Sequence, residues 1–211
     1  QPAIFQLPVT IDVYGADDKP VRHEIFIDDR KERFEFDAMS KPKLINFDAD
    51  NVLLAEIEDN KTEAEMIFQL KNVSHFADRY EAMKALSESD APEVNELMVE
   101  ALKDDFYVIR AMGLSNVSVT PPLEDQLIKM ATDDPHSVVR LNTLTLLANT
   151  GDPKFAAVAK KAMNDPSYSV VGSGLEALAA LNPAEAKTAA KDLESSDNPE
   201  VLASIGEIYA T

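Results

Sequence analysis

The chain has 211 residues, no cysteine and a formal net charge of −18. Without cysteine there is no disulfide, no thiolate metal ligand and no thiol nucleophile. Such an acidic excess argues against nucleic acid as a partner, because phosphate recognition needs a surplus of Lys and Arg. Hydrophobic residues make up 45% of the chain, enough for a core, yet no apolar run is long enough to span a bilayer.

The first part of the chain, up to about residue 57, has the two-residue hydrophobic period of β-strands. Five short strands are expected, at about 4–13, 21–27, 34–36, 44–47 and 52–57. Pro8 restricts its position to a sheet edge or a bulge, and a turn is expected at 17–20. The pattern predicts part of an antiparallel β-sandwich over residues 1–61. Because a full sandwich usually has about seven strands and ~100 residues, we expect missing strands before Gln1 or tight packing against the helices that follow.

Helical spacing begins near residue 62, where Thr62 and Glu65 form a predicted capping box. Further helices are expected at about 75–86, from 92, at 106–116, from 121, at 134–148, at 153–163, from 183 and from 199. Asp134 is the expected cap of the 134–148 helix, with Pro135 in its first turn. Prolines in this half therefore mark where helices begin.

The segment 133–148 recurs along the chain, which indicates a repeat architecture. About thirty-one residues downstream, Asp165-Pro166 leads to a similar apolar pattern, and Asp104 lies about thirty residues upstream of Asp134. This period suits short HEAT-like repeats built from two small helices. We therefore predict a mixed, two-domain fold: the partial sandwich at 1–61, then an all-α HEAT-like solenoid (an α-α superhelix) at 62–211.

Arginines recur with the repeat at Arg79, Arg110 and Arg140, and two interpretations are open. They form a ladder that joins neighbouring repeats through Asp104, Asp134 and Asp165, or a row on the concave face that holds a ligand carboxylate. We favour the ladder, because periodic residues in solenoids usually serve stacking.

Candidate catalytic and metal residues are few. His23-Glu24 begins like the H-E-x-x-H zinc motif, but Ile27 holds the second histidine's place and the segment alternates like a strand. His75 and His136 lie at separate helix starts without metal-ligand spacing. Residues 48–51 hint at a calcium loop but fit a hairpin turn better. Neither G-x-S-x-G nor a P-loop occurs, so no catalytic, cofactor-binding or metal residue is assigned.

Several runs together resemble a known family of zinc peptidases. These are F-Q-L-P-V-T-I-D-V-Y-G at 5–15, E-I-F-I-D-D at 24–29, F-E-F at 34–36, K-P-K-L-I-N-F-D-A-D at 41–50, L-L-A-E-I at 53–57 and D-N-K-T at 59–62. They resemble the β-sandwich that follows the catalytic domain in gluzincins of the aminopeptidase N type, bacterial branch. Q-L-K-N-V at 69–73 and D-R-Y-E-A at 78–82 resemble the junction with their C-terminal helical domain.

The resemblance implies that this chain is a non-catalytic C-terminal region, with the zinc site and the G-x-M-E-N element in an upstream domain of the same polypeptide. That domain would be its partner, and peptide substrate would reach it only indirectly, with the solenoid capping the substrate chamber. No cofactor is expected in the chain itself, and we expect no hydrolysis by it alone. Excess acid on the inner helices would attract a peptide N-terminus, or would only keep the surface soluble; we favour the second interpretation.

A related transcription-factor subunit shares this architecture without catalysis, so the parent's activity stays open. The alternative function is a HEAT-like protein-interaction scaffold. We expect a soluble chain, cytoplasmic or periplasmic, that binds neither membrane nor nucleic acid.

Overall fold

The computed structural model describes residues 6–37 and 40–210. Within them the chain forms three β-strands, ten α-helices and one short 3-10 helix. The chain folds into two compact units, residues 1–90 and 91–211. The first unit holds the strands with α1 and α2, and the second holds α3 to α10. The combination of a small antiparallel sheet with a helical repeat region confirms the predicted fold class, whereas the domain boundary at 61/62 stays a prediction.

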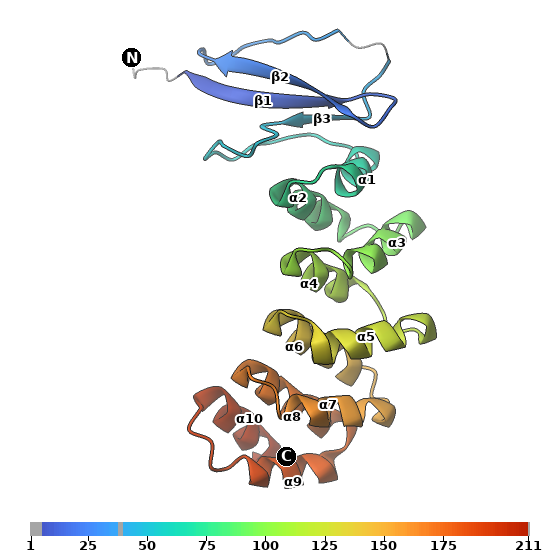
Figure 1. The fold of residues 1–211 in the computed structure, drawn as a ribbon, viewed down its shortest axis with the longest axis vertical. Helices are drawn as coiled ribbons and strands as arrows, with labels where there is room; N and C mark the ends of the chain where they lie inside the picture. Colours follow the sequence, from blue (N-terminus) through green and yellow to red (C-terminus); the bar gives the residue numbers. More distant parts are fainter. Residues whose placement is uncertain (1–5, 38–39, 211) are drawn as a thin grey trace. The chain divides into compact units, whose positions relative to one another are not determined.

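The sheet has the order β2-β1-β3, and both pairs are antiparallel. β1 is Leu7–Tyr14, β2 is Pro20–Ile27 and β3 is Leu44–Phe47 (Figure 1). β3 pairs only with positions 11–14 of β1, so Pro8 lies where β1 has a partner on one side alone. Proline tolerates this position because it has no N–H to donate on the open side. The expectation that Pro8 lies at an edge is thereby confirmed.

Two of the five expected strands do not form. Phe34 and Phe36 lie in irregular chain, and Phe36 packs against the sheet residues Val9, Ile11, Val13 and Ile25. Residues 52–57 are irregular as well, with Leu54 fully exposed. The physical reason is local: Asp48 accepts the backbone N–H groups of Val52 and Leu53, at 3.1 and 2.9 Å, and these bonds close a turn. The apolar alternation there has no neighbouring strand to pair with.

Two helices complete the first unit. α1, Glu63–Asn72, begins at the predicted capping box: Thr62 accepts from the Glu65 N–H while Glu65 accepts from the Thr62 N–H. α2 is Phe76–Leu86. The buried residues Tyr14, Leu44 and Val73 form a small cluster with Phe68 of α1, so the end of the sheet packs on this helix. The Tyr14 and Phe68 rings meet edge to face with centroids 5.4 Å apart.

The second unit is a series of antiparallel helix pairs. Its helices are α3 (Pro92–Ala101), α4 (Tyr107–Asn116), α5 (Pro121–Asp133), α6 (Ser137–Ala148), η1 (Pro153–Phe155) with α7 (Ala156–Ala162), α8 (Tyr168–Leu181), α9 (Pro183–Asp192) and α10 (Pro199–Ala210). α4 packs on α6, α6 on α8 and α8 on α10, so the second helices of the pairs form one layer. α5 packs on α7 in the layer of first helices, and one apolar core lies between the two layers (Figure 1).

The expected start of α6 at Asp134 is wrong by two residues. His136 is the N-cap, and its Nδ1 atom accepts from the Val138 N–H at 3.3 Å. Asp134 instead accepts from the His136 N–H at 2.9 Å. Asp134 (φ −59°, ψ 134°) and His136 (φ −103°, ψ 125°) both have the extended backbone usual for an N-cap, but only His136 accepts from an N–H of the helix itself. The aspartate therefore lies in the turn before the helix rather than at its cap.

Glycine allows close helix contact at equivalent places in two pairs. A Cβ on Gly113 of α4 would lie 2.9 Å from the Met98 carbonyl oxygen, and one on Gly174 of α8 would lie 2.7 Å from the Ala162 Cβ. Real Cβ contacts are essentially never shorter than 3.0 Å, so both pairs pack too closely for any larger residue. None of the helices in the described part of the chain has the length and apolarity that crossing a membrane requires.

Candidate functional site: the second-helix layer of residues 91–211

Two arginines of the second-helix layer are held in buried ion pairs that join successive repeats. Arg110 of α4 donates from Nε and Nη2 to both carboxylate oxygens of Asp134, at 2.8 and 2.7 Å. Arg140 of α6 makes the same bidentate pair with Asp165, at 2.7 Å for each bond. Both arginines are only 8% exposed. Paired N–H···O bonds of this kind are the strong, geometrically specific form of Arg recognition.

The third guanidinium nitrogen of each arginine, Nη1, donates to a backbone carbonyl oxygen in the turn that precedes its own helix. Nη1 of Arg110 donates to the carbonyl oxygen of Asp104 at 2.8 Å, and Nη1 of Arg140 to that of Asp134 at 2.7 Å. Each arginine therefore fixes its own entry turn and the entry turn of the next repeat. The ladder interpretation is confirmed for these two rungs. Because each guanidinium is buried and its charge is already paired with an aspartate, Arg110 and Arg140 do not form a row that holds a ligand carboxylate.

The contact between Arg140 and Asp165 also shifts the pKa values of these two groups. Hydrogen bonding to Asp165 raises the pKa of Arg140, against an opposing effect of burial. Burial alone would raise the pKa of Asp165, but hydrogen bonds from Arg140 and the Ser167 N–H, with the arginine charge, bring it below its usual value. Both groups therefore stay charged at neutral pH. Arg79 lies in the first unit, where it donates to the Ser74 carbonyl oxygen, and its rung with Asp104 stays a prediction.

Charged side chains of the second unit are divided unequally between its layers. The first helices carry thirteen: Glu93, Glu96, Glu100, Glu124, Asp125, Lys129, Asp133, Lys160, Lys161, Glu185, Lys187, Lys191 and Asp192. The second helices carry five: Arg110, Arg140, Glu176, Glu200 and Glu207. Two of these five are the buried ladder arginines. The surface of α4 and α6 is therefore uncharged, on a chain whose net charge is −18.

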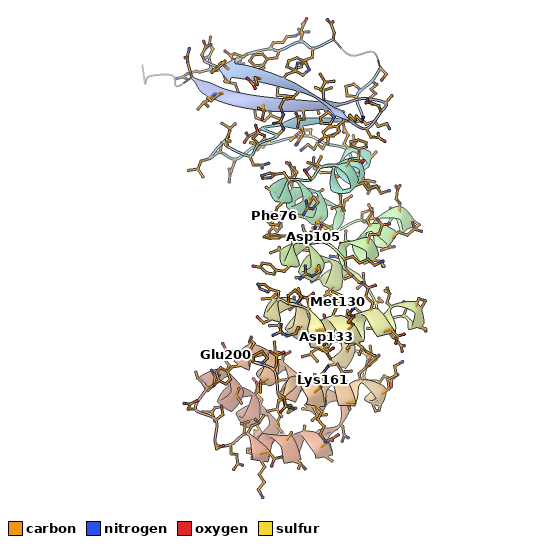
Figure 2. The ribbon with its side chains drawn as sticks, in the orientation of Figure 1. Phe76, Asp105, Met130, Asp133, Lys161 and Glu200 are labelled. Atoms are coloured by element: carbon orange, nitrogen blue, oxygen red, sulfur yellow. The ribbon has the colours of Figure 1, made fainter. Side chains whose placement is uncertain are left out.

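Ion pairs join successive first helices. Lys154, in the turn before α7, lies 2.7 Å from Glu124 of α5, and Lys161 of α7 lies 3.6 Å from Asp133 of α5. Figure 2 shows Asp133 and Lys161 in neighbouring helices of this layer. These pairs are largely exposed, and exposed pairs contribute little to stability. The first-helix layer is thus a solvated, charged surface, in contrast to the second-helix layer.

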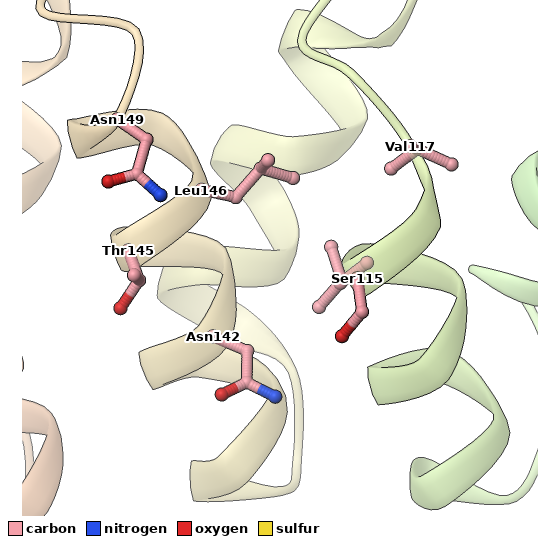
Figure 3. A pocket seen from close by; sticks show the side chains of 7 residues that line it. Ser115, Val117, Asn142, Thr145, Leu146 and Asn149 are labelled. Carbon is pink, nitrogen blue, oxygen red and sulfur yellow. The ribbon is translucent and has the colours of Figure 1, made fainter. Parts of the chain in front are cut away.

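A shallow pocket lies on the uncharged surface between α4 and α6. It has a volume of about 290 Å³ and is lined by Leu114, Ser115, Val117, Asn142, Thr145, Leu146 and Asn149 (Figure 3). The lining therefore combines apolar side chains with amides and hydroxyls, and none of it is charged. We name this site the amide pocket.

The histidines and the 48–51 turn do not assemble into a metal site. His23 lies on β2 and stacks on Phe36 with centroids 4.1 Å apart, while His75 and His136 are helix N-caps. Asp48 uses its oxygens to close the turn before residue 52. Among residues 6–37 and 40–210, no group of three or more His, Asp or Glu side chains is placed to hold a metal ion.

The first unit contains a second polar feature, a buried cluster at the junction of β3 with the helices. Asn46 of β3, Gln69 of α1 and Asp78 of α2 are 1%, 0% and 4% exposed. Gln69 donates to the Asp78 carbonyl oxygen at 2.8 Å and Asn51 donates to the Asp78 carboxylate at 3.3 Å. Within the described residues, one oxygen of the Asp78 carboxylate has no hydrogen-bond partner, and burial raises the pKa of this group.

Sequence reasoning found the ladder but missed the amide pocket and the buried cluster. The unequal division of charge was visible in principle, because the runs 107–116 and 137–148 contain a single charged residue each. The pocket itself requires knowing that α4 and α6 are neighbours. Nothing in the sequence indicated that Asn46 and Gln69 are buried, since a polar residue in a strand or helix is usually on the solvated face.

Comparison with known proteins supports this architecture. Residues 124–208 match the HEAT repeats family. The structure is similar to a solved aminopeptidase A of Legionella pneumophila in complex with aspartic acid, with a TM-score of 0.60 and 12% sequence identity. The similarity covers 97% of this chain and 32% of that one, so the chain spans about a third of the length of that aminopeptidase. No curated protein matches the chain. At this identity the likeness establishes the fold: a small sheet followed by HEAT-like helical repeats.

Proposed function

We propose that residues 1–211 form the C-terminal region of a zinc-dependent aminopeptidase of the aminopeptidase N type. The observation that carries the proposal is the fold match over 97% of the chain to one third of an aminopeptidase. The family-like runs of the first sixty residues point the same way. In this proposal the sheet is a spacer after an upstream catalytic domain, and the helical repeats wall the substrate chamber.

The described residues do not fit a catalytic zinc site. His23 and Glu24 lie on strand β2, where neighbouring side chains point to opposite faces, whereas the zinc motif needs two imidazoles on one face of a helix. Ile27 replaces the second histidine. The zinc ligands and the general base therefore belong to the proposed upstream domain. In this proposal the present chain lines the substrate chamber and supplies no reacting group.

The interpretation that acidic side chains attract a peptide N-terminus loses support for α4 and α6. Attraction of a cationic peptide N-terminus requires acids on the helices that face the substrate, but neither helix contains Asp or Glu. The acids of the second unit lie mostly on the first helices and in turns. The uncharged surface of α4 and α6 suits steric restriction of the chamber better than electrostatic recruitment.

The test begins with the reading frame upstream of the Gln1 codon. We expect an H-E-x-x-H motif followed by a more distant glutamate in the same frame. The longer protein should hydrolyse aminoacyl anilides in a chelator-sensitive way, and the 211-residue chain alone should not. A continuous upstream frame without the motif, or a longer protein inactive with zinc supplied, would contradict the proposal. The protein-interaction scaffold, which the uncharged surface of α4 and α6 also suits, would then be preferred.

A further inference from the structure

The amide pocket contains two asparagines whose side-chain amides make no hydrogen bond within the described residues. Asn142 is half-buried and Asn149 is exposed, both on α6. In Figure 3 the Asn142 amide points across the gap toward Ser115 of α4. Each amide offers two donor hydrogens and one acceptor oxygen. The pocket therefore presents four donors and two acceptors that the protein itself does not use.

The two hydroxyl groups beside these amides are already oriented. Ser115 donates to the Ala111 carbonyl oxygen at 3.2 Å, and Thr145 donates to that of Leu141 at 3.1 Å. With their hydrogens engaged on their own helices, both hydroxyls face a ligand as acceptors. Leu114, Val117 and Leu146 supply the apolar part of the lining.

The electrostatics of the site exclude an ionic ligand. α4 and α6 carry no charged side chain other than Arg110 and Arg140, and both guanidinium groups are occupied by ladder bonds. A phosphate or carboxylate would find no cation here, and an ammonium or guanidinium no anion. The complementary ligand is neutral, with alternating donors and acceptors and small apolar groups. A polypeptide main chain has this chemistry, since every peptide unit offers one N–H and one C=O.

We propose that the amide pocket binds the main chain of a short, extended, uncharged peptide segment. Asn142 and Asn149 each pair with a peptide unit through one N–H···O=C and one C=O···H–N bond, and the apolar lining accepts small side chains. A volume of about 290 Å³ is at the lower limit of ligand pockets, roughly 300–1,000 Å³, which suits a few residues rather than a folded partner. The choice of a peptide as occupant rests on the proposed function.

The experiment uses the 211-residue chain and a neutral probe, the N-acetylated, C-amidated peptide Ala-Ser-Gly-Ala-Ser. Side-chain NH2 resonances of Asn142 and Asn149 are followed in nitrogen-15 correlation spectra during titration. We expect saturable shifts of both, lost when the central peptide nitrogens of the probe are methylated. No shift at either asparagine, or equal shifts with the methylated probe, would overturn the inference.

Three variants localise the effect. Asn142→Asp with Asn149→Asp keeps side-chain shape but removes the donors, so the dissociation constant of the probe, measured for all variants from backbone amide shifts of α4 and α6, should rise at least tenfold. Asn95→Ala changes an exposed asparagine on α3, in the charged layer, and should leave binding unchanged. Equal loss in both would contradict the proposed site. A correlation spectrum otherwise like that of the native chain shows that the double variant is folded.

Failure of the inference is distinguishable from failure of the proposed function. If the longer protein hydrolyses aminoacyl anilides while the 211-residue chain ignores the probe, the pocket proposal is wrong and the function stands. If the chain binds the probe while the longer protein is inactive with zinc, the pocket stands as the peptide site of a scaffold.

Discussion

Arg140→Met tests whether the arginine ladder is structural. The substitution keeps an unbranched apolar side chain but removes two 2.7 Å bonds to Asp165 and one 2.7 Å bond to the Asp134 carbonyl oxygen. The Asp165 side chain, 9% exposed, keeps only the Ser167 N–H at 2.8 Å. Removing one partner of a buried ion pair costs about 3–5 kcal/mol, because the other charge stays buried and unpaired. We expect a loss of this size in the free energy of unfolding.

Urea unfolding followed by far-ultraviolet circular dichroism measures the loss, and hydrogen exchange in α6 and α8 localises it. Adding Asp165→Asn to Arg140→Met removes the unpaired charge, so the double variant should be more stable than the single one by about 1–3 kcal/mol. Lys154→Met is the control, because its ion pair with Glu124 is largely exposed and should contribute less than about 1 kcal/mol. Equal losses for Arg140→Met and Lys154→Met would refute the argument.

The ladder also has a defined pH dependence. The folded-state pKa of Asp165 lies below its usual value, so its stabilising contribution is present above the unfolded-state pKa and is lost as pH falls through the folded one. The stability difference between the native chain and Arg140→Met should therefore shrink in acid, which unfolding measured across the acid range checks. A difference that grew on acidification would show that the carboxylate is not the partner.

Four further substitutions test three other features, each by the free energy of unfolding. Burial raises the pKa of Asp78, so the contribution of this group to stability is full below its unfolded-state pKa and is lost as the pH rises through the folded-state pKa. Asp78→Asn should therefore stabilise the chain more at pH 7 than at pH 4. The opposite trend would contradict burial as the cause of the shift. Gly174→Ala places a Cβ 2.7 Å from a neighbour and should cost about 1–3 kcal/mol. Gly206→Ala, with nothing within 4 Å, should instead gain about 0.5–1 kcal/mol from helix propensity; equal effects of the two would refute the close-packing argument. Thr62→Ala removes the α1 cap and should cost about 0.5–2 kcal/mol, whereas no loss would mean that the capping box with Glu65 is not formed in solution.

Most of the helical region could be predicted from local signals. The capping box at Thr62 and the prolines at 92, 121, 153, 183 and 199 mark true helix starts. Pro135 and Pro166 were the exceptions, because the aspartates before them are held by arginines from the preceding repeat. A local cap was predicted where a non-local ion pair competes for the same carboxylate.

The strands were predicted less well, because a strand needs a partner. Residues 44–47 and 52–57 have similar apolar character, yet only the first pairs with β1. A sequence pattern states which face of a strand would be apolar, but not whether another strand lies beside it. The absence of a local metal motif was visible from His23 and Ile27 alone.

The sequence by itself determined the repeat, its period and the near absence of charge from the runs 107–116 and 137–148, because each follows from residue types at fixed spacing. The tertiary structure alone decided which side chains meet: Asn142 and Ser115 across the amide pocket, and Asn46 with Asp78 under the sheet. Those encounters depend on how elements distant in sequence pack against each other, which the spacing within one helix or strand does not specify.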